Sequence, residues 1–335
     1  MSQERPSIPE PAHRTRRREP LPSEHPKPVE EDSECAARLD AIMQHPSYLA
    51  ADQDVEFLHT HATRGLRLHL DYLKAEEGLV EHGVERCIVV FGSTRLREPY
   101  AALRALAGAR KAAAAAPDDP ALARRLELAE HRMALSRYYE IGRELGRLVG
   151  EAGEGPADSR LIVMTGGGPG AMESANRGAF EAGADSAGLN ITLPSEQYPN
   201  PYLTPGLCFQ FHYFALRKLH FMKRAAAIVA LPGGLGTLDE LFGTLTLIQT
   251  RKVPPIPVVL IGEDYWRRVF DIDYLLEVGS IDPEDTELFW YAETAAEAWA
   301  GIREWHDANG SPLFATNAGR ESRDDGAEMP EERNT

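Results

Sequence analysis

The chain has 335 residues, of which 43% are hydrophobic, and this length and apolar content predict a globular protein of one large or two ordinary domains. Its formal net charge of −16 at pH 7 argues against broad binding to nucleic acids or anionic membranes, because both need a basic surface. The three isolated cysteines indicate neither a disulfide framework nor a zinc cluster, and no run of residues suits a signal peptide or a membrane span, so we expect a cytoplasmic protein.

Both ends of the chain are predicted to be disordered tails. Residues 1–34 are rich in charge and proline, and residues 316–335 are rich in charge. Both segments are nearly free of large apolar side chains, so they cannot bury enough surface to fold. Between them we expect one domain, residues 35–315, which begins with a helical lead-in over 36–81. That lead-in carries His59, His61 and His69, but their spacing is poor for a shared helix face, and we expect no metal site.

Six short apolar runs alternate with longer helical patterns through the core of the sequence. Because these runs hold consecutive apolar residues, they are typical of strands covered on both faces, as in a parallel sheet. An alanine-rich segment at about 99–135, with Pro-Asp-Asp-Pro at its middle, predicts an inserted helical hairpin. The fold class is therefore α/β, a doubly wound, Rossmann-like, mostly parallel sheet with flanking helices. The expected strands are residues 86–92, 161–165, 186–191, 207–213, 226–231 and 256–262.

Three loops leave the carboxyl ends of expected strands, which is where open α/β sheets bind ligands. They read FGSTR, which includes Ser93, then TGGGPGAMESANRGA, and then LPGGLGTLDE. Glycines let the backbone approach a ligand closely and point amide groups outward at a helix N-terminus. The need for a tight turn would explain one such loop, whereas two glycine-rich loops in one sheet favour the binding of a phosphate. The expected binding residues are Gly166, Gly167, Gly168, Gly170, Gly233, Gly234, Gly236 and Thr237.

Charged residues accompany these loops. Glu240 is expected in the first turn of a helix, where the helix dipole should keep its carboxylate ionised at neutral pH. The alternative is that Glu240 only stabilises the start of the helix through this dipole and has no role in a site. Arg217 and Lys218 flank the apolar stripe of the preceding helix, so their charged groups either extend to water or line a pocket. The two glycine loops favour the second alternative. Glu173 is a second first-turn carboxylate, for which a surface ion pair with Arg177 is the alternative.

Together, GGGPGAMESANRGA, FHYFALRK and LPGGLGTLDE closely resemble the Lonely Guy family, long labelled lysine-decarboxylase-like, whose members are nucleoside 5′-monophosphate phosphoribohydrolases. The resemblance covers about residues 85–305 and leaves out the tails and the hairpin. It implies that Arg217 and Glu240 are the catalytic pair and that the two glycine loops, with Ser93 and Lys218, hold the substrate. The PGAMES form looks like the larger bacterial branch of purine and pyrimidine nucleotide nucleosidases, in which Glu173 would be a further site residue.

The resemblance also implies a reaction and a state of assembly. A nucleoside monophosphate, AMP-like or a cytokinin riboside monophosphate, would be hydrolysed to free base and ribose 5-phosphate by a homodimer or higher homo-oligomer that needs no cofactor or metal. The decarboxylase label is disfavoured because a pyridoxal enzyme needs a Schiff-base lysine. A non-catalytic nucleotide or molybdenum-cofactor carrier and a nucleotide sensor stay open as alternatives. Arg217 and Glu240 together favour the enzyme, because a carrier needs the loops but not the carboxylate.

Overall fold

The computed structural model of the chain describes residues 26–194 and 198–314, together with residues 11, 13–17, 19 and 21. The predicted tail at 316–335 lies outside the described residues, as do residues 1–10, 12, 18, 20 and 22–25 of the predicted tail at 1–34. Internal contacts divide the chain into two units, Met1–Arg67 and Leu68–Thr335, and each is described by itself. Within the described ranges, no helix combines the length and the apolar character that crossing a membrane requires.

The described part of the first unit contains short helices without a core of their own. Helix α1 (Cys35–Met43) and helix α2 (Val55–Leu58) are separated by a 3-10 turn, η2 (Pro46–Tyr48), and α3 (Arg64–Glu81) starts at the end of the unit. Every residue of α1 and α2 is at least partly exposed. Asp54 caps α2 by accepting a hydrogen bond from the Phe57 amide at 2.9 Å, so local hydrogen bonds rather than burial define this helix.

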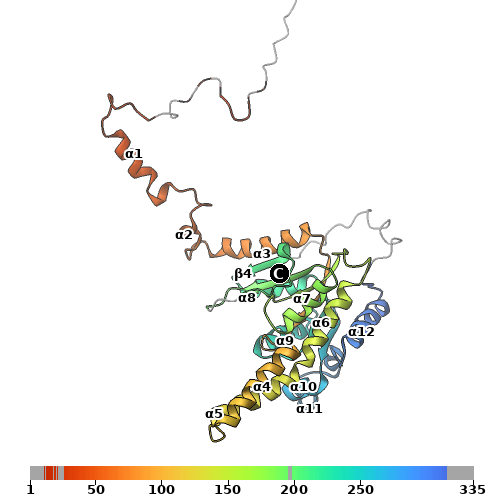
Figure 1. Cartoon of the computed structure of the whole chain (residues 1–335). Coiled ribbons are helices and arrows are strands. Elements are labelled where there is room, and N and C mark those ends of the chain that lie inside the picture. The colour runs from red at the N-terminus through yellow and green to blue at the C-terminus, as the bar shows by residue number, and fades with distance from the viewer. Residues whose placement is uncertain are drawn as a thin grey trace, which may run out of the picture. The chain divides into compact units, whose positions relative to one another are not determined.

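The second unit is built on a seven-stranded sheet in which every strand pair is parallel (Figure 1). Its order is β4-β3-β2-β1-β5-β6-β7, so the predicted doubly wound parallel sheet is confirmed. Each predicted strand lies within two residues of an observed one. The seventh was not predicted, because its three residues make too short an apolar run. The strands are β1 (Arg86–Phe91), β2 (Leu161–Thr165), β3 (Ser186–Ile191), β4 (Cys208–Phe211), β5 (Ala225–Ala230), β6 (Val258–Ile261) and β7 (Trp290–Ala292).

Alternate residues of β1 show why both faces of the sheet are covered. Cys87, Val89 and Phe91 belong to one buried apolar cluster, whereas Ile88 and Val90 belong to another. Because successive side chains of a strand point to opposite faces, each cluster lies on its own side of the sheet. The first cluster is completed by α3, α8 (Phe214–Lys223), α9 (Leu235–Gln249) and α10 (Glu263–Val269). The second is completed by α6 (Arg137–Gly150), α7 (Ala171–Glu181) and α12 (Ala295–Ala308), while α11 (Ile272–Glu277) follows α10 in the chain.

Helices α6 and α7 approach each other backbone to backbone because glycines face the contact. A Cβ atom on Gly146 would lie 2.0 Å from the Ala175 carbonyl oxygen, and one on Gly178 would lie 1.8 Å from the Arg143 carbonyl oxygen. Only a residue without a side chain fits at such distances. The contact fixes α7, whose N-terminus carries the glycine-rich loop that follows β2.

Residues 99–135 form two antiparallel helices where the sequence predicted a hairpin. Helices α4 (Pro99–Ala115) and α5 (Pro120–Leu135) pack against each other and run side by side in Figure 1. Proline opens each helix, where its missing N–H costs no hydrogen bond. Asp119 ends the turn by accepting a hydrogen bond from the Ala121 amide at 2.8 Å. The C-terminal end of α5 leads directly into α6 and so stays close to the sheet.

Candidate functional site

A cavity of about 770 Å³ opens at the carboxyl ends of β1, β2 and β5. Its walls include residues 92–96 after β1, Gly166 after β2 and residues 232–237 after β5. Strands β1 and β5 are neighbours in the sheet although three strands separate them in the chain, so the strand order reverses between them. Ligands of open α/β sheets bind at such a switch point, and the volume is that of a small-molecule site.

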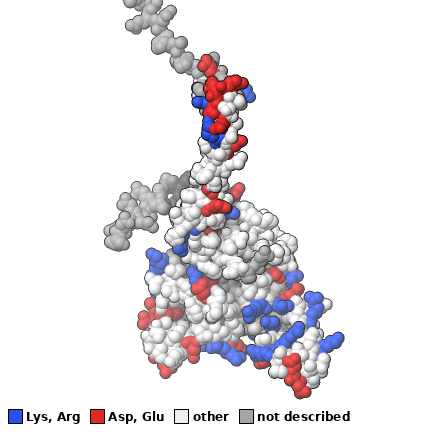
Figure 2. Space-filling view, turned by 90° about the vertical axis from the view of Figure 1, so that its left-hand side faces the viewer, with Lys and Arg blue, Asp and Glu red and all other residues white. Residues whose placement is uncertain are grey.

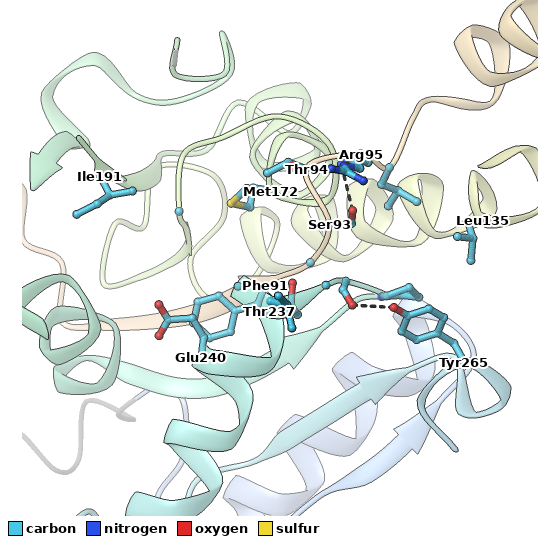
Figure 3. Close-up of a pocket in the computed structure, with 18 of the residues that line it drawn as sticks. Phe91, Ser93, Thr94, Arg95, Leu135, Met172, Ile191, Thr237, Glu240 and Tyr265 are labelled. Carbon is cyan, nitrogen blue, oxygen red and sulfur yellow. Dashed lines mark hydrogen bonds between the residues drawn. The ribbon is translucent and has the colours of Figure 1, made fainter. Parts of the chain in front are cut away.

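The loop after β5 presents backbone to the cavity. A Cβ atom on Gly233 would lie 2.1 Å from the Thr237 hydroxyl oxygen, so this position needs a glycine. The Tyr265 hydroxyl donates a hydrogen bond to the Gly233 carbonyl oxygen at 2.7 Å and holds the turn from the α10 side (Figure 3). Helix α9 begins at Leu235, and the first amide groups of a helix have no intrahelical partner. This arrangement can bind an anion.

Buried polar side chains hold the loop after β2. The Thr165 hydroxyl donates to Asn176 Oδ1 at 2.7 Å and accepts from the Gly167 amide at 2.9 Å. The Asn200 side-chain amide donates to Asn176 Oδ1 at 3.0 Å and to the Gly168 carbonyl at 3.1 Å. Thr165, Asn176 and Asn200 are all buried, so their hydrogen bonds are protected from water and fix the loop.

The glycines of the loop after β2 differ in whether they line the cavity. Gly166 lines the cavity, whereas Gly167, Gly168 and Gly170 are not among the lining residues. Gly170 has a φ of 75°, and its Cβ would lie 2.4 Å from the Ser93 carbonyl oxygen. Ser93 itself lines the cavity, and its amide donates to the Pro232 carbonyl at 3.0 Å, so backbone contacts join all three loops.

Arg217 of α8 and Glu240 of α9 meet at the cavity wall. Arg217 Nη2 lies 3.3 Å from Glu240 Oε1, and the two side chains are 14% and 6% exposed. Both line the cavity, together with Gly234, Gly236 and Thr237. Lys218 lies behind them: its Nζ is 3.7 Å from Glu240 Oε2 and 3.1 Å from Asp239 Oδ2, and it is not a lining residue.

The expected helix-dipole effect on Glu240 needs correction. The sequence predicted a first-turn position, but α9 starts at Leu235 and Glu240 therefore lies in the second turn, where the dipole has weakened. Burial raises the pKa of Glu240 above its ordinary value, and the nearby charges of Lys218 and Arg217 oppose that rise only in part. Desolvation thus dominates over the stabilisation that the sequence pattern predicted.

Arg217 has a hydrogen-bond donor that no described residue accepts. Burial lowers the pKa of Arg217, with Glu240 acting in the opposite direction. Its Nε atom is buried and has no hydrogen-bond partner within the described part of the chain. Because a buried donor without an acceptor is costly, a ligand with an oxygen at this place would complete the site.

Glu173 lies in the first turn of α7, as predicted, but the cavity is not lined by it. Its carboxylate accepts a hydrogen bond from the Tyr139 hydroxyl of α6 at 2.8 Å. Arg177 forms ion pairs with Glu181 at 2.9 Å and with Glu98 at 3.3 Å. These contacts take the place of the ion pair between Arg177 and Glu173 that was the alternative. A role for Glu173 at the ribose or the water stays a prediction.

Sequence reasoning missed the walls that α5 and α10 contribute. Arg132 and Leu135 reach the cavity from the end of the hairpin, and Tyr265 reaches it from α10. In Figure 3, Glu240 lies on one side of Thr237, while Leu135 and Tyr265 lie on the other. Tyr265 could have been found, because it follows the sixth expected strand at its carboxyl end. No local signal identified Arg132, because only tertiary packing brings α5 to the cavity.

The cavity residues do not fit a pyridoxal site. No lysine is among the described residues that line it, and Lys218 points to Asp239 instead. Nor do the described ranges contain a group of three or more His, Cys, Asp and Glu residues that could hold a metal ion. The candidate groups for chemistry at this cavity include Arg217, Glu240 and the backbone amides around them.

The fold and this cavity define a Rossmann-like α/β protein with a candidate ligand site at the switch point of its sheet. A family model described as "Possible lysine decarboxylase" matches residues 172–302. A cytokinin riboside 5′-monophosphate phosphoribohydrolase of Arabidopsis thaliana is 36% identical over 91 residues, which are 27% of this chain and 42% of that protein. A pyrimidine/purine nucleotide 5′-monophosphate nucleosidase of Escherichia coli K12 is 32% identical over 121 residues, 32% of this chain and 26% of that protein.

These matches confirm the predicted resemblance to the Lonely Guy family. The chain spans less than half the length of either of these two relatives. Among solved structures, the molybdenum cofactor carrier protein of Chlamydomonas reinhardtii is 17% identical, with 67% of this chain and 99% of that chain covered at a TM-score of 0.40.

Proposed function

We propose that this chain hydrolyses the N-glycosidic bond of nucleoside 5′-monophosphates to free base and ribose 5-phosphate. The observation that carries the proposal is the buried Arg217–Glu240 pair on the wall of a cavity that the glycine loop before α9 also lines. The Arabidopsis and Escherichia coli relatives are named for the hydrolysis of such nucleotides, which supports the same substrate class.

The 5′-phosphate would be held by the backbone amides at the start of α9. Glu240 lies five residues beyond Leu235, about 7.5 Å along the helix axis. A phosphate at the helix start would therefore place the ribose near the carboxylate. Binding energy from the phosphate, which does not react, would orient the bond that breaks.

In the reaction, the bond between C1′ and the base nitrogen breaks, a water oxygen bonds to C1′, and a proton is delivered to the base. Positive charge develops on the sugar as the bond breaks, and an ionised Glu240 would stabilise it and accept a proton from the water. A pKa raised by burial suits a general base, because such a base works best when its pKa is near the operating pH. Arg217 would hold the carboxylate and bind a phosphate or ribose oxygen.

We also propose that the chain forms homodimers in the cytoplasm. Leu235 and Phe242 of α9 and Phe214 and Leu219 of α8 are exposed apolar side chains, of the kind that subunit contacts cover. The three free cysteines favour a reducing compartment. Light scattering coupled to gel filtration tests the assembly; a mass of one chain at micromolar concentration would contradict it.

The test of the activity is incubation with AMP, GMP, CMP and isopentenyladenosine monophosphate, with free base measured by chromatography. We expect base release from at least one nucleotide and none from the unphosphorylated nucleosides. Glu240→Gln should lower kcat by about 10²–10⁴-fold, the usual contribution of a general base. Asp239→Asn removes the neighbouring charge, which is 63% exposed, and should keep activity.

No release from any nucleotide by the folded wild-type protein would contradict the hydrolase. If a nucleotide nevertheless binds and stays intact, the result would favour a carrier or a sensor. Equal activity of wild type and Glu240→Gln would contradict the role given to Glu240.

A further inference from the structure

The hairpin region is basic in an acidic chain. From Arg95 to Arg137 the sequence holds nine Lys and Arg residues and five Asp and Glu residues. This segment therefore has a formal net charge of +4, whereas that of the whole chain is −16. In Figure 2 the lowest tip, where α4 turns into α5, is acidic, and Lys and Arg side chains gather above it. A local excess of positive charge beside a cavity attracts anions.

Two of these cations line the cavity and have no carboxylate partner among the described residues. Arg95 follows β1, and Arg132 lies in the last turns of α5. Neither guanidinium takes part in an ion pair within the described ranges, whereas Arg110, Arg124 and Arg137 of the same segment each pair with a glutamate. A guanidinium with free donors at a cavity wall is suited to phosphate oxygens.

His131 belongs to the same wall and has a partner. It lines the cavity, and its Nε2 lies 3.8 Å from Glu127 Oε1. Both side chains are more than half exposed, so this contact is weak and leaves the wall positive. The excess charge at the cavity therefore comes from Arg95 and Arg132.

These cations lie on the side of the cavity away from Glu240. Figure 3 shows Glu240 and Ile191 on one side of Thr237, and Arg95 and Leu135 on the other. Arg132 is three residues before Leu135 and lines the same cavity, so it belongs to the Leu135 side. A nucleotide with its ribose at Glu240 and its phosphate at the start of α9 would direct the free phosphate oxygens toward these arginines.

We propose that Arg95 and Arg132 form a second phosphate subsite, and that the cavity accepts nucleoside 5′-diphosphates in addition to monophosphates. The inference rests on the proposed function and extends its substrate class. Hydrolysis of a diphosphate would break the same bond between C1′ and the base nitrogen. The water oxygen would bond to C1′, the base would gain the proton, and the product would be ribose 5-diphosphate with its phosphoanhydride intact.

The experiment compares kcat/KM for ADP and AMP, by release of adenine, in the full-length wild type, Arg132→Ala and Arg125→Ala. Arg125 is an exposed residue on the same face of α5, seven residues or about 10 Å away, and does not line the cavity. We expect the ratio of ADP to AMP to be about tenfold lower in Arg132→Ala than in wild type, as for the loss of one charge-assisted hydrogen bond. Arg125→Ala should keep the wild-type ratio.

The outcomes separate this inference from the proposed function. The subsite would be overturned, and the hydrolase would stand, if AMP is cleaved and Arg132→Ala leaves the ratio of kcat/KM for ADP to that for AMP unchanged. The same conclusion would follow if Arg125→Ala lowers this ratio as much as Arg132→Ala does. If neither ADP nor AMP is cleaved, the wider panel of nucleotides decides the hydrolase, and calorimetric affinities for ADP and AMP decide the subsite. Tighter binding of ADP that Arg132→Ala abolishes would support it, and equal affinities in wild type would overturn it.

Discussion

Burial acts against charge on both members of the Arg217–Glu240 pair. It raises the pKa of the glutamate and lowers that of the arginine, although their side chains are only 3.3 Å apart. Desolvation offsets much of the attraction in buried pairs, so such a pair contributes little to stability. Its position on a cavity wall, with Arg217 Nε unpartnered in the described chain, fits use by a ligand.

Lys218 should set the pH at which Glu240 becomes active. Its charge lowers the pKa of Glu240, so Lys218→Met should raise that pKa further. A general base must be ionised, and kcat/KM falls as the pH drops through its pKa. We therefore expect the acidic limb of the profile of kcat/KM against pH to move to higher pH in the variant.

The control for this profile is Lys223→Met, on the same helix. Lys223 binds Glu76 at 2.8 Å and is not among the groups that shift Glu240. Its acidic limb should coincide with that of the wild type. An unshifted limb in Lys218→Met would contradict the electrostatic role of Lys218.

At the scale of elements, the packing of α6 on α7 determines where the loop after β2 lies. Gly178 of α7 has a backbone oxygen 1.8 Å from the place of a Cβ atom, and α7 begins at the residue that follows the Gly166–Gly170 turn. A side chain at Gly178 would push the two helices apart. The displacement would be transmitted to the turn, because Asn176 of α7 is bonded to Thr165.

Gly178→Ala should therefore lower the free energy of unfolding by about 1–3 kcal/mol, the usual cost of overpacking. Gly108→Ala is the matched control: it lies in α4, is exposed, and has open space around its Cβ position. It should raise the free energy of unfolding by about 0.5–1 kcal/mol through helix propensity. Urea titrations of both variants measure the difference, and equal effects of the two would contradict the close packing.

Across the whole molecule, acidic residues outnumber basic ones, and the half-buried carboxylate of Glu76 should contribute to the acid limit of stability. Glu76 of α3 accepts hydrogen bonds from Arg224 at 2.7 Å and 2.8 Å and from Lys223 at 2.8 Å. These bonds, above all that from Arg224, hold the pKa of Glu76 at about 2 although burial opposes them. They attach α3 to the end of α8, the helix that carries Arg217.

Because this pKa is lower in the folded than in the unfolded chain, the stabilisation is complete above about pH 4.5 and is lost as the pH falls toward 2. Glu76→Gln should therefore lower the free energy of unfolding at pH 7 by about 2–3 kcal/mol. It should also flatten the dependence of stability on pH between those limits. Glu77→Gln, an exposed neighbour, serves as control. Parallel stability curves for wild type and Glu76→Gln below pH 4.5 would contradict the linkage.

Local patterns in the sequence determined the six longer strands, the glycine loops, and the identity of Arg217 and Glu240 as candidate residues. Each of these features is written in contiguous residues: an apolar run, a glycine turn, or a motif within one helix start. Parallel pairing followed from the same runs, because strands buried on both faces need no polar alternation.

Only the tertiary structure decided which of these residues meet. Arg217 and Glu240 lie on different helices, and their contact and the upward pKa shift of Glu240 depend on how α8 and α9 bury them. Packing likewise brings Arg132 of the hairpin to the cavity and directs Glu173 to Tyr139. Burial and proximity arise from contacts between residues remote in the chain, and no local pattern encodes them.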